Sequence, residues 1–165
     1  MIIAKSITGE RTQVDAKDLV WAINLYAVVV KEGKILISPQ WKENGFDFPG
    51  GHLELGEKHL DGLVREVKEE TGFNVKPTKI IDVFTSFFMH PRKNRPQQSI
   101  KIYYGADIVS GEISTEGFDE GELSYARPAC FVTLQELKNM EFMCVDQGPL
   151  EFIMPYLEQA VKKVV

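Results

Sequence analysis

Three glutamates, Glu66, Glu69 and Glu70, are spaced so that together they could hold a divalent cation. Offsets of three and four residues place them on one side of a helix, within an arc of about 100°. Like charges at these spacings repel one another and destabilise a helix, and a bound cation would offset that cost. Carboxylate oxygens suit Mg²⁺, for which Mn²⁺ could substitute, and they disfavour zinc.

A solvated charged face is the alternative explanation of the same three residues. Glutamate is an excellent helix former, and a run of charged residues usually lies on the exposed side of a helix. If a metal is bound, it could lower the pKa of a water molecule and offset charge on a phosphate. A carboxylate free of metal could then act as general base. The three glutamates alone do not decide between the two interpretations.

The residues around these glutamates follow a longer pattern, which runs from Gly51 to Phe73. It reads Gly, five residues, Glu, seven residues, then Arg-Glu-apolar-x-Glu-Glu-x-Gly-apolar. The matching positions are Gly51, Glu57, Arg65, Glu66, Val67, Glu69, Glu70, Gly72 and Phe73. This stretch resembles the signature of the Nudix hydrolase family, and the segment 46–51, Phe-Asp-Phe-Pro-Gly-Gly, resembles the lead-in typical of that family. No subfamily is assigned.

The resemblance implies an α/β fold, the Nudix-type α/β/α sandwich with a mixed β-sheet. It also implies a Mg²⁺-dependent pyrophosphohydrolase, in which water attacks a phosphorus of a nucleoside diphosphate linked to another moiety. Glu66, Glu69, Glu70 and the carbonyl of Gly50 would then bind the metal, and a glutamate would supply the base. The catalytic residues carried over from the family are Glu57, Arg65, Glu66, Glu69 and Glu70. Of these, Glu57 and Arg65 would pair and hold the others in place.

Two parts of this assignment stay open. Family members often add a carboxylate from a loop after the signature, and the acidic segment 111–122 offers Glu120 or Glu122 as the general base. A Nudix-shaped sensor that binds a nucleotide metabolite without cleaving it is one alternative function. Such sensors typically lose carboxylates that are all present here. An RNA 5′-end pyrophosphohydrolase is the second alternative function, and the acidic net charge of the chain argues against it.

Length and composition favour one soluble globular domain over residues 1–165. The chain is 44% hydrophobic and 26% charged, with a net charge of −5 that argues against nucleic acid as a partner. Its longest apolar stretch, 21–30, falls short of the ~20 residues of a membrane helix, so no membrane partner is expected. We expect a cytoplasmic protein with free thiols at Cys130 and Cys144 and a small nucleotide-type substrate. The resemblance leaves a homodimer open.

The elements that must position the glutamates can be read from hydrophobic periodicity. We expect a helix from Glu57 or Lys58 to Thr71, ended by Gly72. A turn at 31–34 should join strands 23–30 and 35–38, and further strands should span 80–88 and 99–109. A loop is expected over 39–56, a short helix at a capping box that begins at Thr133, and a last helix from about Pro149. Pro155 should kink that helix or delay its start.

Aromatic and histidine residues near the signature are weaker candidates for contact with substrate. Trp41, Phe46 and Phe48 could stack a nucleobase or pack in the core, and Phe48 is assigned to the core. His52 lies in the glycine-containing loop and could touch the substrate. An isolated histidine is otherwise an ordinary surface residue.

Overall fold

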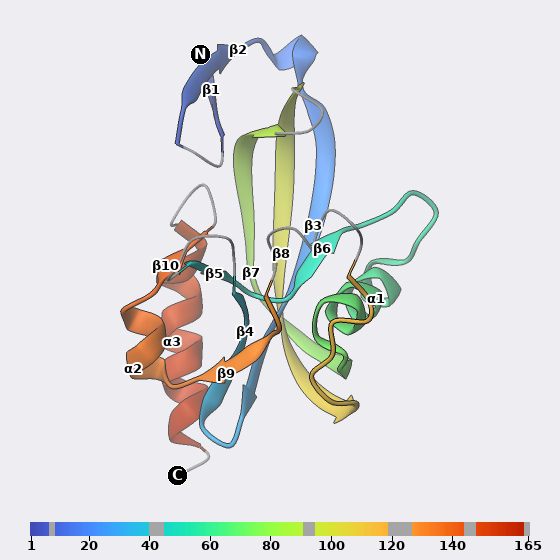
Figure 1. Cartoon of the computed structure of the whole chain (residues 1–165). Coiled ribbons are helices and arrows are strands. Elements are labelled where there is room, and N and C mark those ends of the chain that lie inside the picture. Colours follow the sequence, from blue (N-terminus) through green and yellow to red (C-terminus); the bar gives the residue numbers. More distant parts are fainter. Residues whose placement is uncertain (7–8, 40–44, 91–94, 119–126, 144–147, 164–165) are drawn as a thin grey trace.

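The computed structural model describes residues 1–6, 9–39, 45–90, 95–118, 127–143 and 148–163. These residues form a mixed β-sheet between helices. α1 (His59–Thr71) lies on one face, and α2 (Leu134–Lys138) and α3 (Gly148–Lys162) lie on the other (Figure 1). The α/β/α sandwich with a mixed sheet is therefore confirmed.

The sheet is built around β3, a long strand with neighbours on both sides. The strands run in the order β10-β5-β4-β3-β8-β7-β1-β2, with β6 beside β3 and β9 beside β4. β3 pairs with β8 in parallel and with β4 and β6 in antiparallel fashion. The strand bounds are β1 (Ile2–Lys5), β2 (Arg11–Val14), β3 (Val20–Lys31), β4 (Lys34–Pro39), β5 (Gly45–Asp47), β6 (Gly50–His52), β7 (Asn74–His90), β8 (Arg95–Ser110), β9 (Cys130–Val132) and β10 (Glu141–Phe142). A short 3-10 turn, η1 (Ala16–Asp18), precedes β3.

Two apolar cores lie on opposite faces of this sheet because successive side chains of a strand point to opposite sides. Ala27 of β3 lies with Leu63 of α1, whereas the next residue, Val28, lies with Leu157 of α3. The α1-side core comprises Leu25, Ala27, Val29, Leu36, Leu63, Val67, Phe73, Val75, Tyr104, Ala106 and Ala129. The α3-side core comprises Val28, Ile35, Ile37, Phe46, Phe48, Tyr103, Leu137, Phe142, Ile153 and Leu157.

Several expectations about the ends of elements are confirmed. The β3–β4 turn has positive φ at both central residues, Glu32 (52°) and Gly33 (74°), as a type I′ hairpin requires. α1 begins directly after Lys58 and ends at Gly72, whose N–H donates to the carbonyl of Lys68 at 2.8 Å and whose left-handed φ of 80° turns the chain out of the helix. α2 begins with the reciprocal capping box between Thr133 and Glu136.

Other expectations are wrong in instructive ways. The segment expected as a loop over 39–56 contains two short strands, β5 and β6. β7 and β8 extend beyond 80–88 and 99–109, and β7 keeps its pairing by register shifts near Pro77. α3 begins at Gly148, so Pro155 lies inside the helix and does not delay its start.

Two further expectations concern thiols and membranes. Cys130 is a free cysteine, and Cys144 lies outside the described residues. In the part of the chain that the structure describes, no helix combines the length and the apolar character needed to cross a membrane.

Candidate active site

A glycine pair in β6 brings backbone against the carboxylates of α1. Gly50 pairs with Tyr26 and Gly51 with Leu25, so the loop before the helix is anchored on the central strand. Gly50 has a φ of 146°, and a Cβ there would collide with the carbonyl oxygen of Leu25. A Cβ on Gly51 would collide with the carboxylate of Glu66. Both positions therefore need glycine for close approach, one to β3 and the other to α1.

Glu70 is the buried carboxylate of the group. Its Oε2 accepts hydrogen bonds from the backbone N–H of Gly50 at 2.9 Å and from Ser38 Oγ at 3.0 Å. Burial raises the pKa of Glu70 to about 8, and the charges of Asp47 and Glu66 add to the rise, although the two hydrogen bonds oppose it. Without a cation, Glu70 therefore holds a proton at neutral pH.

Asp47 is a second buried carboxylate in the same region. It is the register partner of Ser38 across β4 and β5, so the two side chains lie on the same face of the sheet. Burial raises the pKa of Asp47 to about 6, while the charge of Lys101 and a hydrogen bond from the N–H of Phe48 lower it. The site therefore contains one carboxylate more than the three glutamates.

Arg65 binds the remaining carboxylates through its planar guanidinium. Nε donates to Glu57 Oε1 at 2.9 Å and Nη2 to Glu57 Oε2 at 3.0 Å, which is a bidentate pair. Nη1 donates to both Glu66 Oε1 at 2.8 Å and Glu69 Oε2 at 3.0 Å. Nη2 also reaches the carbonyl of His52 at 3.2 Å. The hydrogen bond from Arg65 lowers the pKa of Glu57, so this carboxylate stays ionised.

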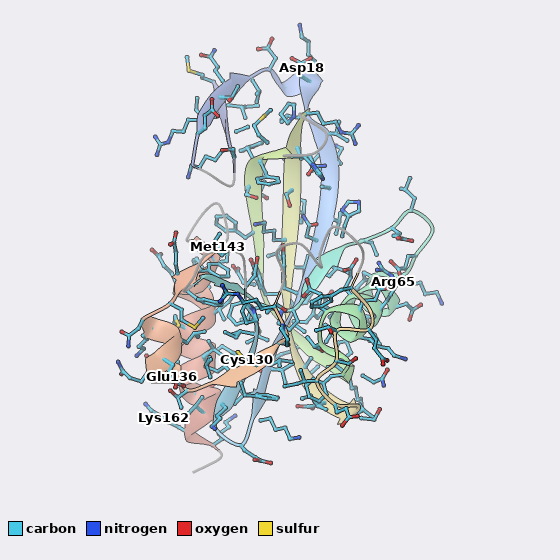
Figure 2. All side chains as sticks on the ribbon, in the orientation of Figure 1. Asp18, Arg65, Cys130, Glu136, Met143 and Lys162 are labelled. Carbon is cyan, nitrogen blue, oxygen red and sulfur yellow. The ribbon has the colours of Figure 1, made fainter. Side chains whose placement is uncertain are left out.

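The positions of these groups on the sandwich follow from the elements that carry them. Arg65 lies on α1, across the sheet from Glu136 on α2 and Lys162 on α3 (Figure 2). α1 meets β6 on its own side of the sheet, and Ser38 reaches Glu70 from the end of β4. The structure thus brings together Gly50, Glu57, Arg65, Glu66, Glu69 and Glu70.

The donor set fits a hard divalent cation because it consists of carboxylate oxygens. Glu66 and Glu69 already share one positively charged nitrogen of Arg65, so both carboxylates can turn to the same cation. Among the described residues, however, no three histidine, cysteine or acidic side chains meet closely enough to enclose an ion. Arg65 holds Glu66 and Glu69, whereas Gly50 and Ser38 hold Glu70. A bound cation would therefore share Glu66 and Glu69 with Arg65, whose hydrogen bonds fix one oxygen of each carboxylate.

Some sequence-based candidates lie elsewhere or outside the described residues. Phe46 and Phe48 are fully buried in the α3-side core, so they pack in the core and do not stack a ligand. Glu120, Glu122 and Trp41 lie outside the described residues. Ser38 and Asp47 were not predicted from the sequence. The one available signal was an aspartate between two phenylalanines in the lead-in to the glycine pair.

Comparison with known proteins places this site in a family. The profile of the NUDIX domain matches residues 20–150. The chain belongs to the Nudix family. This Nudix chain is similar to an ADP-ribose pyrophosphatase of Methanocaldococcus jannaschii, at 32% identity over 73% of this chain and 67% of the relative. It is also similar to a putative ADP-ribose pyrophosphatase of Bacillus subtilis, at 28% identity over 53% of this chain and 41% of the relative.

The fold agrees with that membership. The crystal structure of a MutT protein from Bacillus halodurans superposes with a TM-score of 0.63 at 19% identity, covering 81% of this chain and 82% of that one. The expected family, the sandwich fold and the class of hydrolases that act on phosphoanhydride bonds are confirmed.

Proposed function

We propose that this Nudix chain is a Mg²⁺-dependent pyrophosphohydrolase that cleaves a nucleoside diphosphate linked to another moiety by water attack at phosphorus. The observation that carries the proposal is the fixed, buried Glu70 beside two carboxylates that share one guanidinium nitrogen. The ADP-ribose pyrophosphatase and the putative ADP-ribose pyrophosphatase among the relatives make ADP-ribose the first substrate to test.

The hydrogen bonds of Glu70 suggest which of its oxygens faces the chemistry. Oε2 accepts from Gly50 and Ser38, and no described residue donates to Oε1. Oε1 is therefore the oxygen left for a cation or for the proton of an attacking water. Glu57 and Arg65 do not need to touch the substrate, since their pairing orients Glu66 and Glu69.

A bound Mg²⁺ would supply Lewis-acid stabilisation of the phosphate charge and a water of lowered pKa. Glu66, Glu69, Glu70 and the Gly50 carbonyl are the ligands that we propose for it. The described part of the acidic segment approaches this group, because the backbone N–H of Ser114 donates to the carbonyl of Thr71 at 3.1 Å. Glu120 or Glu122, which lie outside the described residues, stay further candidates for the base on the sequence alone.

The wider setting is also a proposal. We propose one domain over residues 1–165, a cytoplasmic location and a small nucleotide-type substrate, with a homodimer left open. The acidic net charge of −5 continues to argue against nucleic acid.

The test is an assay of the purified chain with Mg²⁺ against ADP-ribose, nucleoside triphosphates, sugar nucleotides and dinucleotides. We expect metal-dependent release of two phosphate-bearing products, and ¹⁸O-labelled water would identify the phosphorus attacked. Glu70→Gln should abolish turnover with the circular dichroism spectrum unchanged. The matched control is Asp61→Asn, an exposed carboxylate of the same helix, which should retain activity.

Three results would redirect or overturn the proposal. Binding of a nucleotide without turnover of any substrate would favour the sensor. Faster hydrolysis of triphosphorylated RNA than of the small substrates would favour the RNA 5′-end hydrolase. Full activity of Glu70→Gln would show that the carboxylate assignment is wrong.

A further inference from the structure

A cavity of about 230 Å³ lies between α3 and the sheet. Val30 of β3, Lys79 of β7 and Asp107 of β8 line it from the sheet. The helix and the residue that follows it contribute four more, spaced three and four apart on one helical face: Tyr156, Gln159, Ala160 and Lys163. α1 and its glutamates lie on the opposite face of the sheet (Figure 1), so this cavity is separate from the candidate active site.

Contacts with the sheet hold Tyr156 at the cavity. A Cβ on Gly105 of β8 would lie 2.6 Å from Tyr156 Oη, so the hydroxyl lies against the backbone of that strand. Nζ of Lys79 lies 5.1 Å from the centroid of the Tyr156 ring, within the range of a cation–π interaction. Burial, followed by the charge of Asp107, raises the pKa of the Tyr156 hydroxyl. The hydroxyl therefore keeps its proton and can donate a hydrogen bond to a ligand.

The polar groups around the cavity do not satisfy one another. Within the described part of the chain, Lys79 and Lys163 form no ion pair with Asp107 or with any other carboxylate. The Tyr156 hydroxyl and the Gln159 side-chain amide likewise have no hydrogen-bond partner among the described residues. Two ammonium groups and a carboxylate thus surround one cavity without pairing, and a ligand that carries complementary groups would satisfy all three.

The donors of the cavity indicate the anionic end of such a ligand. Lys79, Lys163 and Tyr156 supply three donor groups, which matches the three terminal oxygens of a phosphate monoester, whereas a carboxylate has only two oxygens. Lysine is also a common phosphate-binding residue. The whole chain has a net charge of −5, but the ionisable groups of the cavity are two lysines and one aspartate, so the cavity is locally positive.

Asp107 and the size of the cavity indicate the rest of the ligand. An ionised carboxylate only accepts hydrogen bonds, so Asp107 repels a bare phosphate ion and needs a donor such as a hydroxyl group. A volume of about 230 Å³ is below the roughly 300–1,000 Å³ of pockets for drug-sized ligands. A whole nucleotide is therefore too large for the cavity, whereas a phosphorylated molecule of a few carbons fits.

We propose that this cavity binds a small phosphorylated polyol, of the size of a triose or pentose phosphate, with its phosphate at Lys79, Lys163 and Tyr156 and a hydroxyl group at Asp107. The inference does not depend on the proposed function, because none of these residues belongs to the glutamate group on α1. The ligand would join α3 to β7 and β8, so its binding should raise the thermal midpoint of the protein.

The test is isothermal titration calorimetry in EDTA, with glycerol 3-phosphate and ribose 5-phosphate as probes. Both should bind more tightly than inorganic phosphate, which lacks hydroxyl groups on carbon, and more tightly than gluconate, whose anionic group is a carboxylate. Lys79→Met and Lys163→Met should each weaken binding of the two probes by about tenfold, because each removes a charged donor. Tyr156→Phe should weaken it several-fold, because a neutral donor is lost.

Matched variants separate recognition from general charge. Lys162→Met removes the neighbouring lysine, which does not line the cavity, and should leave the affinity for both probes unchanged. Asp107→Asn should reduce the preference for ribose 5-phosphate over inorganic phosphate, because it weakens the acceptor for a hydroxyl group and removes repulsion of the ion. The thermal midpoint of each variant without ligand shows whether it is folded.

The outcomes distinguish this inference from the proposed function. If neither probe binds, or if both bind equally well to Lys79→Met, Lys163→Met and the unaltered protein, the cavity is not the site. Inorganic phosphate that binds as tightly as ribose 5-phosphate, or gluconate that binds more tightly, overturns the assigned ligand class. A protein that hydrolyses nothing yet binds the probes through these two lysines would refute the proposed function and support the cavity site.

Discussion

Arg65 links more of the site than any other described side chain, because its nitrogens donate to Glu57, Glu66, Glu69 and the His52 carbonyl. A lysine carries a single ammonium and cannot form the bidentate pair with Glu57 while also reaching the other two carboxylates. We therefore expect Arg65→Lys to weaken metal affinity by about 10–100-fold. Electron paramagnetic resonance of bound Mn²⁺ measures this directly. Arg11→Lys, at an exposed arginine, is the control, and equal Mn²⁺ affinity in Arg65→Lys would contradict the positioning role.

Glu70 predicts a pH dependence of stability for the metal-free protein. Its pKa is raised from 4.5 to about 8 in the folded state, so the folded protein binds more protons than the unfolded chain over this interval. Stability is then fully present at low pH and is lost as the pH rises toward about 8. The raised pKa of Asp47 adds a similar loss that is complete near pH 6. Of these two carboxyls, Glu70 is therefore the one whose titration lowers stability between about pH 6 and about pH 8.

The measurement is urea unfolding in EDTA across that range, for the unaltered protein and for Glu70→Gln. We expect the free energy of unfolding to fall with pH in the unaltered protein and to fall less in Glu70→Gln. Subtracting the free energy of unfolding of Glu70→Gln from that of the unaltered protein at each pH removes the contributions of distant groups. Parallel curves would show that Glu70 titrates normally.

At the scale of elements, the end of α1 depends on Gly72. Its φ is 80°, and a Cβ there would meet the carbonyl oxygen of Glu112. Gly72→Ala should lower the free energy of unfolding by more than the ~1–2 kcal/mol of left-handed backbone alone. Gly33→Ala is the matched control, since its φ is 74° and a Cβ would meet nothing within 4 Å. If urea unfolding shows the same loss of unfolding free energy in Gly72→Ala and Gly33→Ala, the collision with Glu112 is relieved at no energetic cost.

Gly62 of α1 lies against Glu57, which forms an ion pair with Arg65 of the same helix. A Cβ at this position would lie 2.7 Å from Glu57 Oε2 and 2.9 Å from Leu53 Cδ1. Alanine is the better helix former by about 1 kcal/mol, so glycine here indicates that Glu57 must lie over the helix. We expect Gly62→Ala to stay folded but to bind Mn²⁺ more weakly, because Glu57 is displaced from Arg65. An unchanged Mn²⁺ affinity would show that Glu57 moves aside without losing its ion pair with Arg65.

The sequence predicted those parts of the molecule whose interactions are local. α1, its glycine end and the capping box of α2 depend on residues within four positions of one another. β5, β6 and β10 are two or three residues long and lack a periodic pattern, and the pairing of β6 with β3 and of β10 with β5 joins segments that are distant in the chain. Ser38 was missed for the same reason, since its hydrogen bond to Glu70 spans 32 residues.

At the scale of the whole molecule, the two apolar cores share one set of strands. Ala27 and Val28 are neighbours in β3 and belong to opposite cores, so loss of either core destabilises the strand on which the other core packs. A sheet covered on both faces should therefore unfold as a unit. This is the physical content of the prediction that residues 1–165 form one domain.

Leu63→Ala in α1 and Leu157→Ala in α3 test that prediction, because each removes a fully buried side chain from one core. Each should lower the free energy of unfolding by about 2–5 kcal/mol. If the cores are one cooperative unit, either substitution shifts a single calorimetric transition whose measured enthalpy equals the van't Hoff enthalpy. Two transitions, one lowered only by Leu63→Ala and the other only by Leu157→Ala, would show that the helices on the two faces unfold separately. The catalytic helix could then lose its packing while α3 remained folded, and the single-domain prediction would be wrong.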